Sequence, residues 1–78
     1  MITTAQCQAG RKLLRWNMTQ LATAAGLGMQ AVVSFETGAS QLRLTAEKLR
    51  NAFEAAGVEF FTEADGRPGA RLRKDGVS

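Results

Sequence analysis

The side chains in this sequence that could do chemistry are basic groups and amides, and the usual catalytic and metal-binding groups are scarce. The chain of 78 residues has no histidine and one cysteine, Cys7. A zinc site needs several imidazole or thiolate ligands and an internal disulfide needs two thiols, so the sequence predicts neither. It also offers no convergent acid–base pair. We therefore expect a protein that is not an enzyme and that binds no cofactor or metal.

The positive charge is concentrated near the two ends of the chain. The formal net charge is +3, and basic residues gather at 11–15 and again at 67–74. The segment from Trp16 to Leu42 contains no Lys or Arg. A modest positive charge permits a nucleic-acid partner without requiring one. Because this segment has no basic residues, any long-range attraction to a polyanion must come from the basic residues on either side of it.

Apolar residues recur at helical spacing over four segments, which predicts four helices that would position the basic and amide side chains. Thr3 or Thr4 can cap the first helix and Asn17 the second, because their side-chain oxygens accept hydrogen bonds from first-turn amides. Gly26 can end the second helix in the left-handed conformation, and Gly57 closes the fourth. The predicted helices are 5–16, 19–25, 28–36 and 45–56.

The stretch from Asn17 to Gly38 is interpreted as a helix-turn-helix, because Gly26 leaves room only for a tight corner between its two short helices. Trp16, just before it, either covers the core or presents its ring at an interface. The predicted core of the domain comprises Leu21, Ala22, Ala25, Leu27, Val32, Phe35, Leu49 and Phe53.

Two further apolar stripes complete the helical pattern. Gly10, inside the first helix, costs about 1 kcal/mol relative to alanine, which favours a close approach by another helix at that point. The first helix carries Cys7, Gly10, Leu13 and Leu14 on its stripe. The fourth carries Leu42, Ala46, Leu49, Phe53 and Ala56.

From Val58 the apolar period changes to two, which predicts a β-hairpin. Its strands are VEFFTE and ARLRK, and ADGRPG forms the turn. Phe60 and Phe61 are adjacent and so cover both faces of the ribbon. A lone two-stranded ribbon is marginal in water. We therefore expect one face to pack on the helices and the other on a second subunit in a homodimer, with Phe60, Phe61 and Leu72 as the dimerisation residues.

The expected organisation is a helical domain over 1–57, a C-terminal hairpin over 58–74 and a frayed tail over 75–78. No apolar run approaches the roughly 18 residues that span a bilayer, and the N-terminal residues lack the pattern of a signal peptide. We expect no membrane association and a cytoplasmic location.

Three stretches of the sequence carry a family resemblance: RKLLRWNMTQLATAAGL, VVSFETG and LRNAFEAAGVEF. Together they resemble the XRE family of helix-turn-helix regulators, which includes the Cro/C1-type phage repressors, and in particular its short, single-domain bacterial members. The resemblance implies a mainly α fold, a four-helix Cro/C1-type domain followed by the hairpin. It also implies a sequence-specific regulator of transcription that binds double-stranded DNA as a homodimer.

The resemblance further implies roles for individual residues, with the third helix in the major groove. An arginine of the first helix typically pairs with the glutamate after the third, and these positions are Arg11 and Glu36, a structural ion pair. The implied base-reading residues are Met29, Gln30, Val33 and Ser34. The implied contacts to the DNA backbone come from Asn17, Thr19, Gln20, Thr37 and Arg43.

A second interpretation stays open because the exposed stripe of the third helix is largely uncharged. The same scaffold could serve as a protein-interaction module, an antitoxin-like or anti-activator component that docks on another regulatory protein. In that case Met18, Met29 and Val33 would form the contact surface.

Overall fold

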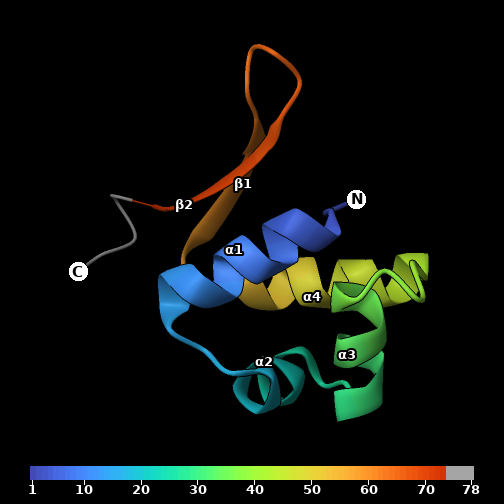
Figure 1. Cartoon of the computed structure of the whole chain (residues 1–78). Helices are drawn as coiled ribbons and strands as arrows, with labels where there is room; N and C mark the ends of the chain where they lie inside the picture. Colours follow the sequence, from blue (N-terminus) through green and yellow to red (C-terminus); the bar gives the residue numbers. More distant parts are fainter. Residues whose placement is uncertain (74–78) are drawn as a thin grey trace.

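A computed structural model describes residues 1–73 of the chain and contains four helices followed by a two-stranded antiparallel hairpin, in the predicted order (Figure 1). Lys74 and the tail predicted to fray, 75–78, lie outside the described residues. The elements are α1 (Thr4–Leu14), α2 (Met18–Ala25), α3 (Met29–Glu36), α4 (Arg43–Ala55), β1 (Val58–Thr62) and β2 (Pro68–Leu72).

The first two helices begin at reciprocal capping boxes. The Thr3 hydroxyl accepts from the Gln6 backbone N–H at 3.0 Å, and the Gln6 side chain accepts from the Thr3 N–H at 3.0 Å. Asn17 and Gln20 do the same at 2.7 and 2.8 Å. Each box satisfies two amides that a helix start leaves without partners. Gly26 ends α2 with a φ of 68°, so the predicted caps at Thr3 and Asn17 and the predicted stop are confirmed.

Some predicted boundaries and apolar positions are wrong. α4 begins at Arg43 rather than at residue 45, and Leu42 is its N-cap, with an extended backbone and 65% of its surface exposed. Because Leu42 precedes the helix, helical spacing does not place it on the buried stripe. Leu13 lies at the margin of the α1 stripe and is 37% exposed, and Ala56, just after α4, is exposed.

The core lies where α1, α4 and the helix-turn-helix meet, and Phe53 is at its centre. The Phe53 ring stacks on Trp16 at a centroid distance of 5.9 Å and meets the edge of Phe60 at 5.6 Å. A Cβ on Gly10 would lie 2.9 Å from the Phe53 ring, so the predicted close approach to Gly10 is confirmed. Trp16 packs against the core rather than standing free. The buried apolar residues are Ile2, Cys7, Leu21, Ala22, Val32, Phe35, Ala46, Leu49, Phe53 and Val58.

The hairpin packs on the helices through Val58 and Phe60, and one buried amide bonds both of its strands. Gln6 is 7% exposed, and its Nε2 donates to the carbonyls of Phe61 at 3.3 Å and Gly69 at 3.1 Å. The register pairs Phe61 with Gly69 and Thr62 with Pro68. Pro68 and Gly69 therefore belong to β2 and not, as predicted, to the turn, which closes at Gly66.

The helix-turn-helix and the hairpin lie on opposite sides of the layer formed by α1 and α4 (Figure 1). α2 and α3 pack on one side of this layer, and β1 and β2 pack on the other. Within residues 1–73, no helix combines the length and apolarity that crossing a membrane requires.

Candidate functional site

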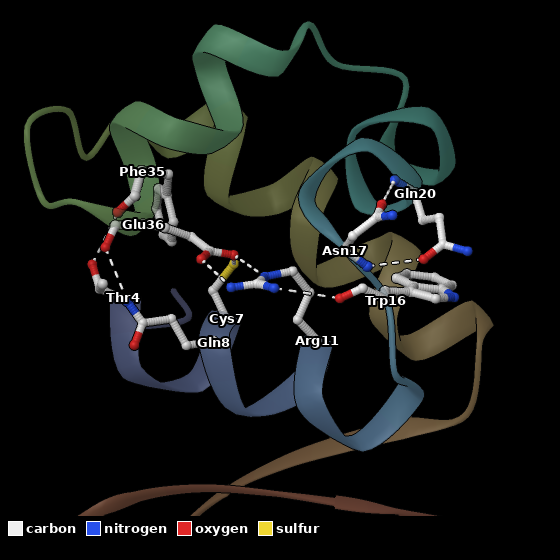
Figure 2. Close-up of polar contacts among 9 residues, drawn as sticks. All are labelled: Thr4, Cys7, Gln8, Arg11, Trp16, Asn17, Gln20, Phe35 and Glu36. Carbon is white, nitrogen blue, oxygen red and sulfur yellow. Dashed lines mark hydrogen bonds and ion pairs between the residues drawn. The ribbon is translucent and has the colours of Figure 1, made fainter.

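The Arg11–Glu36 pair ties α1 to the last residue of α3 (Figure 2). The guanidinium makes two parallel contacts, Nε to Oε2 at 2.7 Å and Nη2 to Oε1 at 2.8 Å. The Glu36 side chain is 2% exposed and that of Arg11 is 21% exposed. Such bidentate pairs are geometrically specific. The structure therefore brings together the two residues that the sequence analysis predicts to pair.

The same carboxylate affects the protonation of its neighbours. Cys7 Sγ lies 3.5 Å from Glu36 Oε2. Burial, followed by the negative charge of Glu36, raises the pKa of the Cys7 thiol to about 12. The hydrogen bond to Glu36 raises the pKa of Arg11 above its ordinary value. The thiol is thus a neutral donor to a buried carboxylate, which gives Cys7 a packing role rather than a nucleophilic one.

Side chains from outside the helix-turn-helix also satisfy the carbonyls that end α3. Thr4 Oγ1 donates to the Phe35 carbonyl at 3.1 Å, and Gln8 Nε2 donates to the Glu36 carbonyl at 3.1 Å (Figure 2). Gln41 Nε2 also reaches the Phe35 carbonyl, at 3.3 Å. The sequence did not indicate these three polar contacts. The acceptors of Thr4 and Gln8 lie 31 and 28 residues away along the chain, and Gln41 lies in a loop without a spacing pattern.

The residues predicted to read bases share one side of α3. Met29 and Val33 are one turn apart, as are Gln30 and Ser34, so the four side chains form a continuous stripe. Met29 is 45% exposed and Gln30 is exposed, whereas Val33 and Ser34 are half-buried. The Met29 sulfur accepts from Thr19 Oγ1 at 3.8 Å, which links the start of α3 to the start of α2. The stripe presents one amide, one hydroxyl and two apolar groups.

The residues predicted to contact the DNA backbone are exposed. In the capping box of α2, Asn17 and Gln20 each use a side-chain oxygen, so both amide NH₂ groups stay available as donors. Thr37 is exposed and donates to the Ser34 carbonyl at 3.3 Å. The Arg43 side chain is 87% exposed and lies 3.4 Å from Glu47.

The arginines of the hairpin do not share this face. Arg67 pairs with Asp65 and Arg71 with Glu59, both at 2.7 Å, and Arg73 donates to a carbonyl at the end of α4. The hairpin extends away from α2 and α3 (Figure 1). These side chains therefore add no positive charge to the α3 stripe within one chain.

The three predicted dimerisation residues have different surroundings. Phe60 packs edge-on against Phe53 in the core. Phe61 lies on the opposite face of the hairpin, where the Arg71 guanidinium sits 4.8 Å from its ring centroid. Leu72 is 45% exposed, so it alone of the three presents a largely open apolar surface.

Within residues 1–73, no three His, Cys, Asp or Glu side chains gather in a way that could hold a metal ion. A scan against protein-family models and a search of curated proteins find no match to this chain.

Proposed function

We propose that this protein is a sequence-specific DNA-binding regulator of transcription that acts as a homodimer, similar to the Cro/C1-type members of the XRE family. In this proposal α3 enters the major groove and presents Gln30, Ser34 and the apolar groups of Met29 and Val33 to base edges. The observation that carries it is the placement of α3, a helix that exposes Met29 and Gln30 at its start and whose end is clamped to α1 by the buried Arg11–Glu36 pair.

The clamp supports this function because a reading helix must be held rigidly. Base contacts require hydrogen-bond geometry accurate to a fraction of an ångström, and a helix of eight residues cannot keep its own orientation in water. The Glu36 carboxylate and the carbonyls of Phe35 and Glu36 are bound by side chains of other segments. The exposed stripe one turn earlier is therefore fixed relative to the whole domain.

The chemistry of the stripe indicates how bases would be read. The Gln30 amide can pair bidentately with adenine N6 and N7, and the apolar groups of Met29 and Val33 fit thymine methyls. Asn17 and Gln20 offer amide donors to a phosphate beside the N-terminus of α2. Arg43 supplies the charged contact. We therefore expect a preference for A·T pairs at the centre of each half-site.

The test has two stages, because the operator is unknown. Duplexes are first selected from a random-sequence library with the full chain, and binding to the selected duplex is then titrated with salt. The exposed cations assigned to phosphate contacts in this proposal are Arg43, Lys12 and Arg15. Three phosphate contacts per protomer give a slope of about −2.7 in log affinity against log salt, and about −5 for a dimer. A failure to enrich any sequence at low salt would refute the proposal.

Variants separate reading from positioning. Gln30→Ala should relax base preference at one position per half-site, with a loss of about 1–3 kcal/mol per protomer on the selected duplex. Arg43→Ala should weaken all duplexes equally and make the salt slope shallower by about one per protomer. Arg50→Ala is the matched control, because Arg50 also pairs within α4, with Glu54 at 2.9 Å, and borders Phe60 and Phe61 on the hairpin side.

The second candidate function is a protein-interaction module that docks on another regulator. One observation favours it: Met29 is 45% exposed on a stripe that carries no charge. Met18, which the sequence analysis added to this surface, instead packs partly buried against the core, so the surface is smaller than predicted. Binding that shows no salt dependence, and that Met29→Lys abolishes while Arg43→Ala leaves it unchanged, would identify this function.

A further inference from the structure

We propose that two copies of this chain associate through the outer edge of β2, with Ala70 at the two-fold axis, and form a continuous four-stranded antiparallel sheet. The inference deepens the proposed function by assigning the surface and the register of its dimer. It replaces the predicted interface, in which one face of the hairpin met the second subunit and Phe60, Phe61 and Leu72 were the dimerisation residues.

The direction of each backbone group in β2 follows from the register of the hairpin. Glu63 N donates to the Arg67 carbonyl at 2.7 Å, and Arg73 N donates to the Gly57 carbonyl at 2.8 Å. Hydrogen-bonded and non-hydrogen-bonded pairs alternate along an antiparallel ladder. The residues of each non-hydrogen-bonded pair direct their N–H and C=O groups away from the partner strand, toward the outer edges of the hairpin. In β2 the outward residues are Pro68, Ala70 and Leu72.

Pro68 is consistent with an outer edge, because its missing N–H removes no bond from the hairpin's own ladder. The backbone N–H groups of Ala70 and Leu72 have no acceptor among residues 1–73. A strand edge with outward donors and acceptors is a template for pairing with another strand. The edge of β2 is therefore open and ready to extend the sheet.

The edge of β1 is less accessible than that of β2. A hollow beside Phe60, Phe61 and Thr62 is lined by Met1, Ile2, Gln6 and Arg50, so the N-terminal residues and α4 flank this strand. β2 ends instead in Leu72, which is 45% exposed. An incoming strand would meet the outer edge of β2 beside α1, which also packs against β2.

β2 is complementary to a second copy of itself. With Ala70 opposite Ala70 of the partner subunit, Gly69 faces Arg71 and Pro68 faces Leu72. The two Ala70 residues exchange two N–H···O=C bonds across the axis. Each Leu72 N–H donates to the Pro68 carbonyl of the partner subunit, which adds two more. Four bonds thus form over five residues, and the absent Pro68 donor leaves only the Leu72 carbonyls unbonded at the ends.

The side chains are compatible with this register. No two like charges face each other directly within 68–72, because Arg71 faces a glycine. Each Arg71 is also neutralised by its own Glu59 at 2.7 Å. The arginines beyond the strand are engaged as well, Arg67 with Asp65 and Arg73 with the end of α4. The small side chain at Ala70 lets the two edges approach to the normal strand spacing of about 4.8 Å.

The symmetry of this pairing suits a regulator that binds two half-sites. A two-fold axis that joins strand edges runs perpendicular to the sheet, so both protomers keep their helices on the same face of it. Both α3 helices then point to the same side, away from the sheet. Packing through the Phe61 faces would point them in opposite directions. To read two successive half-sites, the two α3 helices must lie about 34–36 Å apart, one turn of B-DNA.

The test measures hydrogen exchange of individual amides by NMR on the full chain without DNA, at low and high protein concentration. We expect the Ala70 and Leu72 amides to become protected as concentration rises, in step with a mass that doubles by light scattering. The Phe60 and Thr62 amides of the β1 edge should keep exchanging at one rate. A monomeric mass at every concentration, or a dimer in which the Ala70 amide still exchanges freely, overturns the inference.

One variant that should weaken the dimer and one that should strengthen it, with a proline control on β1, separate an effect on the interface from a folding defect. Ala70→Pro removes two intermolecular bonds and should raise the dimer dissociation constant about thirtyfold, whereas Thr62→Pro removes only an outward N–H of β1 and should leave it unchanged. Pro68→Ala supplies two new donors to the Leu72 carbonyls and should lower the constant about tenfold. Equal effects of the two proline variants, or no tightening by Pro68→Ala, would contradict edge pairing through β2.

The outcome is separable from that of the proposed function. A dimer that meets these criteria but enriches no duplex would leave the interface standing and remove the DNA-binding function. A chain that binds its selected duplex but shows no β2 protection would do the reverse.

Discussion

Breaking the Arg11–Glu36 pair one side at a time should cost far more than removing both members together. Glu36 is 2% exposed and holds two charge-assisted bonds from Arg11, so Arg11→Met leaves a buried carboxylate with only the weak Cys7 donor. We expect that variant to lose about 3 kcal/mol of unfolding free energy. Arg11 is 21% exposed and can turn its charge to water, so Glu36→Leu should lose about 2 kcal/mol.

The double variant should lose only about 1 kcal/mol, because two apolar side chains of similar volume replace the pair without leaving a buried charge. The coupling free energy is therefore about 4 kcal/mol, several times that of an exposed pair. The cycle is measured by urea unfolding, followed by the fluorescence of Trp16, which stacks on Phe53 and reports the core. An osmolyte in every sample keeps the weaker variants folded, since a domain of this size holds only about 3–5 kcal/mol.

A second cycle on Arg50 and Glu54 is the control. This pair has a similar distance, 2.9 Å, but its side chains are 48% and 40% exposed. Its coupling should be about 0.5 kcal/mol and should vanish in high salt, whereas the buried coupling should persist. Additive losses at Arg11 and Glu36, or a coupling that salt removes, would show that the pair is an ordinary surface contact and that the clamp on α3 is misassigned.

Three further outcomes follow from single residues. Gly10→Ala should destabilise the fold by about 1–2 kcal/mol despite its better helix propensity, because the new Cβ would lie 2.9 Å from a Phe53 ring held between two aromatic neighbours; urea unfolding checks this. The pKa of Cys7 is raised from 9.0 to about 12, so between these pH values the unfolded chain loses the thiol proton while the folded chain keeps it. The free energy of unfolding should therefore be unaffected by this thiol below pH 9 and should fall by about 1.4 kcal/mol per pH unit above it. Cys7→Ala should remove this contribution to the slope of stability against pH. Leu42→Ser should stabilise α4 by about 0.5–1 kcal/mol in thermal unfolding, since it supplies the side-chain N-cap that α4 lacks and removes an exposed leucine; a lower midpoint would refute this.

The parts of the fold that local chemistry decides could be predicted from the sequence. Thr3 and Asn17 cap the helices that follow them, and Gly26 ends α2, because each effect involves residues within one turn. The Arg11–Glu36 pair also forms as expected, but that expectation came from a family resemblance and not from spacing. Two charges 25 residues apart carry no geometric signal of their own.

Long-range polar contacts could not be predicted. Gln6 is buried because it reaches carbonyls of the hairpin, and in the sequence it is one of several glutamines near the start of the chain. Gln8 is an equivalent case at the end of α3, where it reaches a carbonyl 28 residues away. The turn signal at Pro68 misled for a related reason: a proline is compatible with a strand when its nitrogen faces the open edge, and only the register shows which way it faces.

Dimerisation multiplies the base discrimination of α3, a helix that presents few polar groups to DNA. A bidentate contact from Gln30 discriminates by about 2 kcal/mol, which is roughly thirtyfold for one protomer. In a rigid dimer the same contact occurs in both half-sites, so the ratio of affinities for the correct and the wrong base is squared, to about a thousandfold. The second protomer then binds at an effective concentration near millimolar. Gln30→Ala should therefore weaken binding of the selected duplex about a thousandfold in the dimer and only about thirtyfold in the Ala70→Pro background. Equal losses in the two backgrounds would mean that the protomers read DNA independently and that the edge of β2 has no part in specificity.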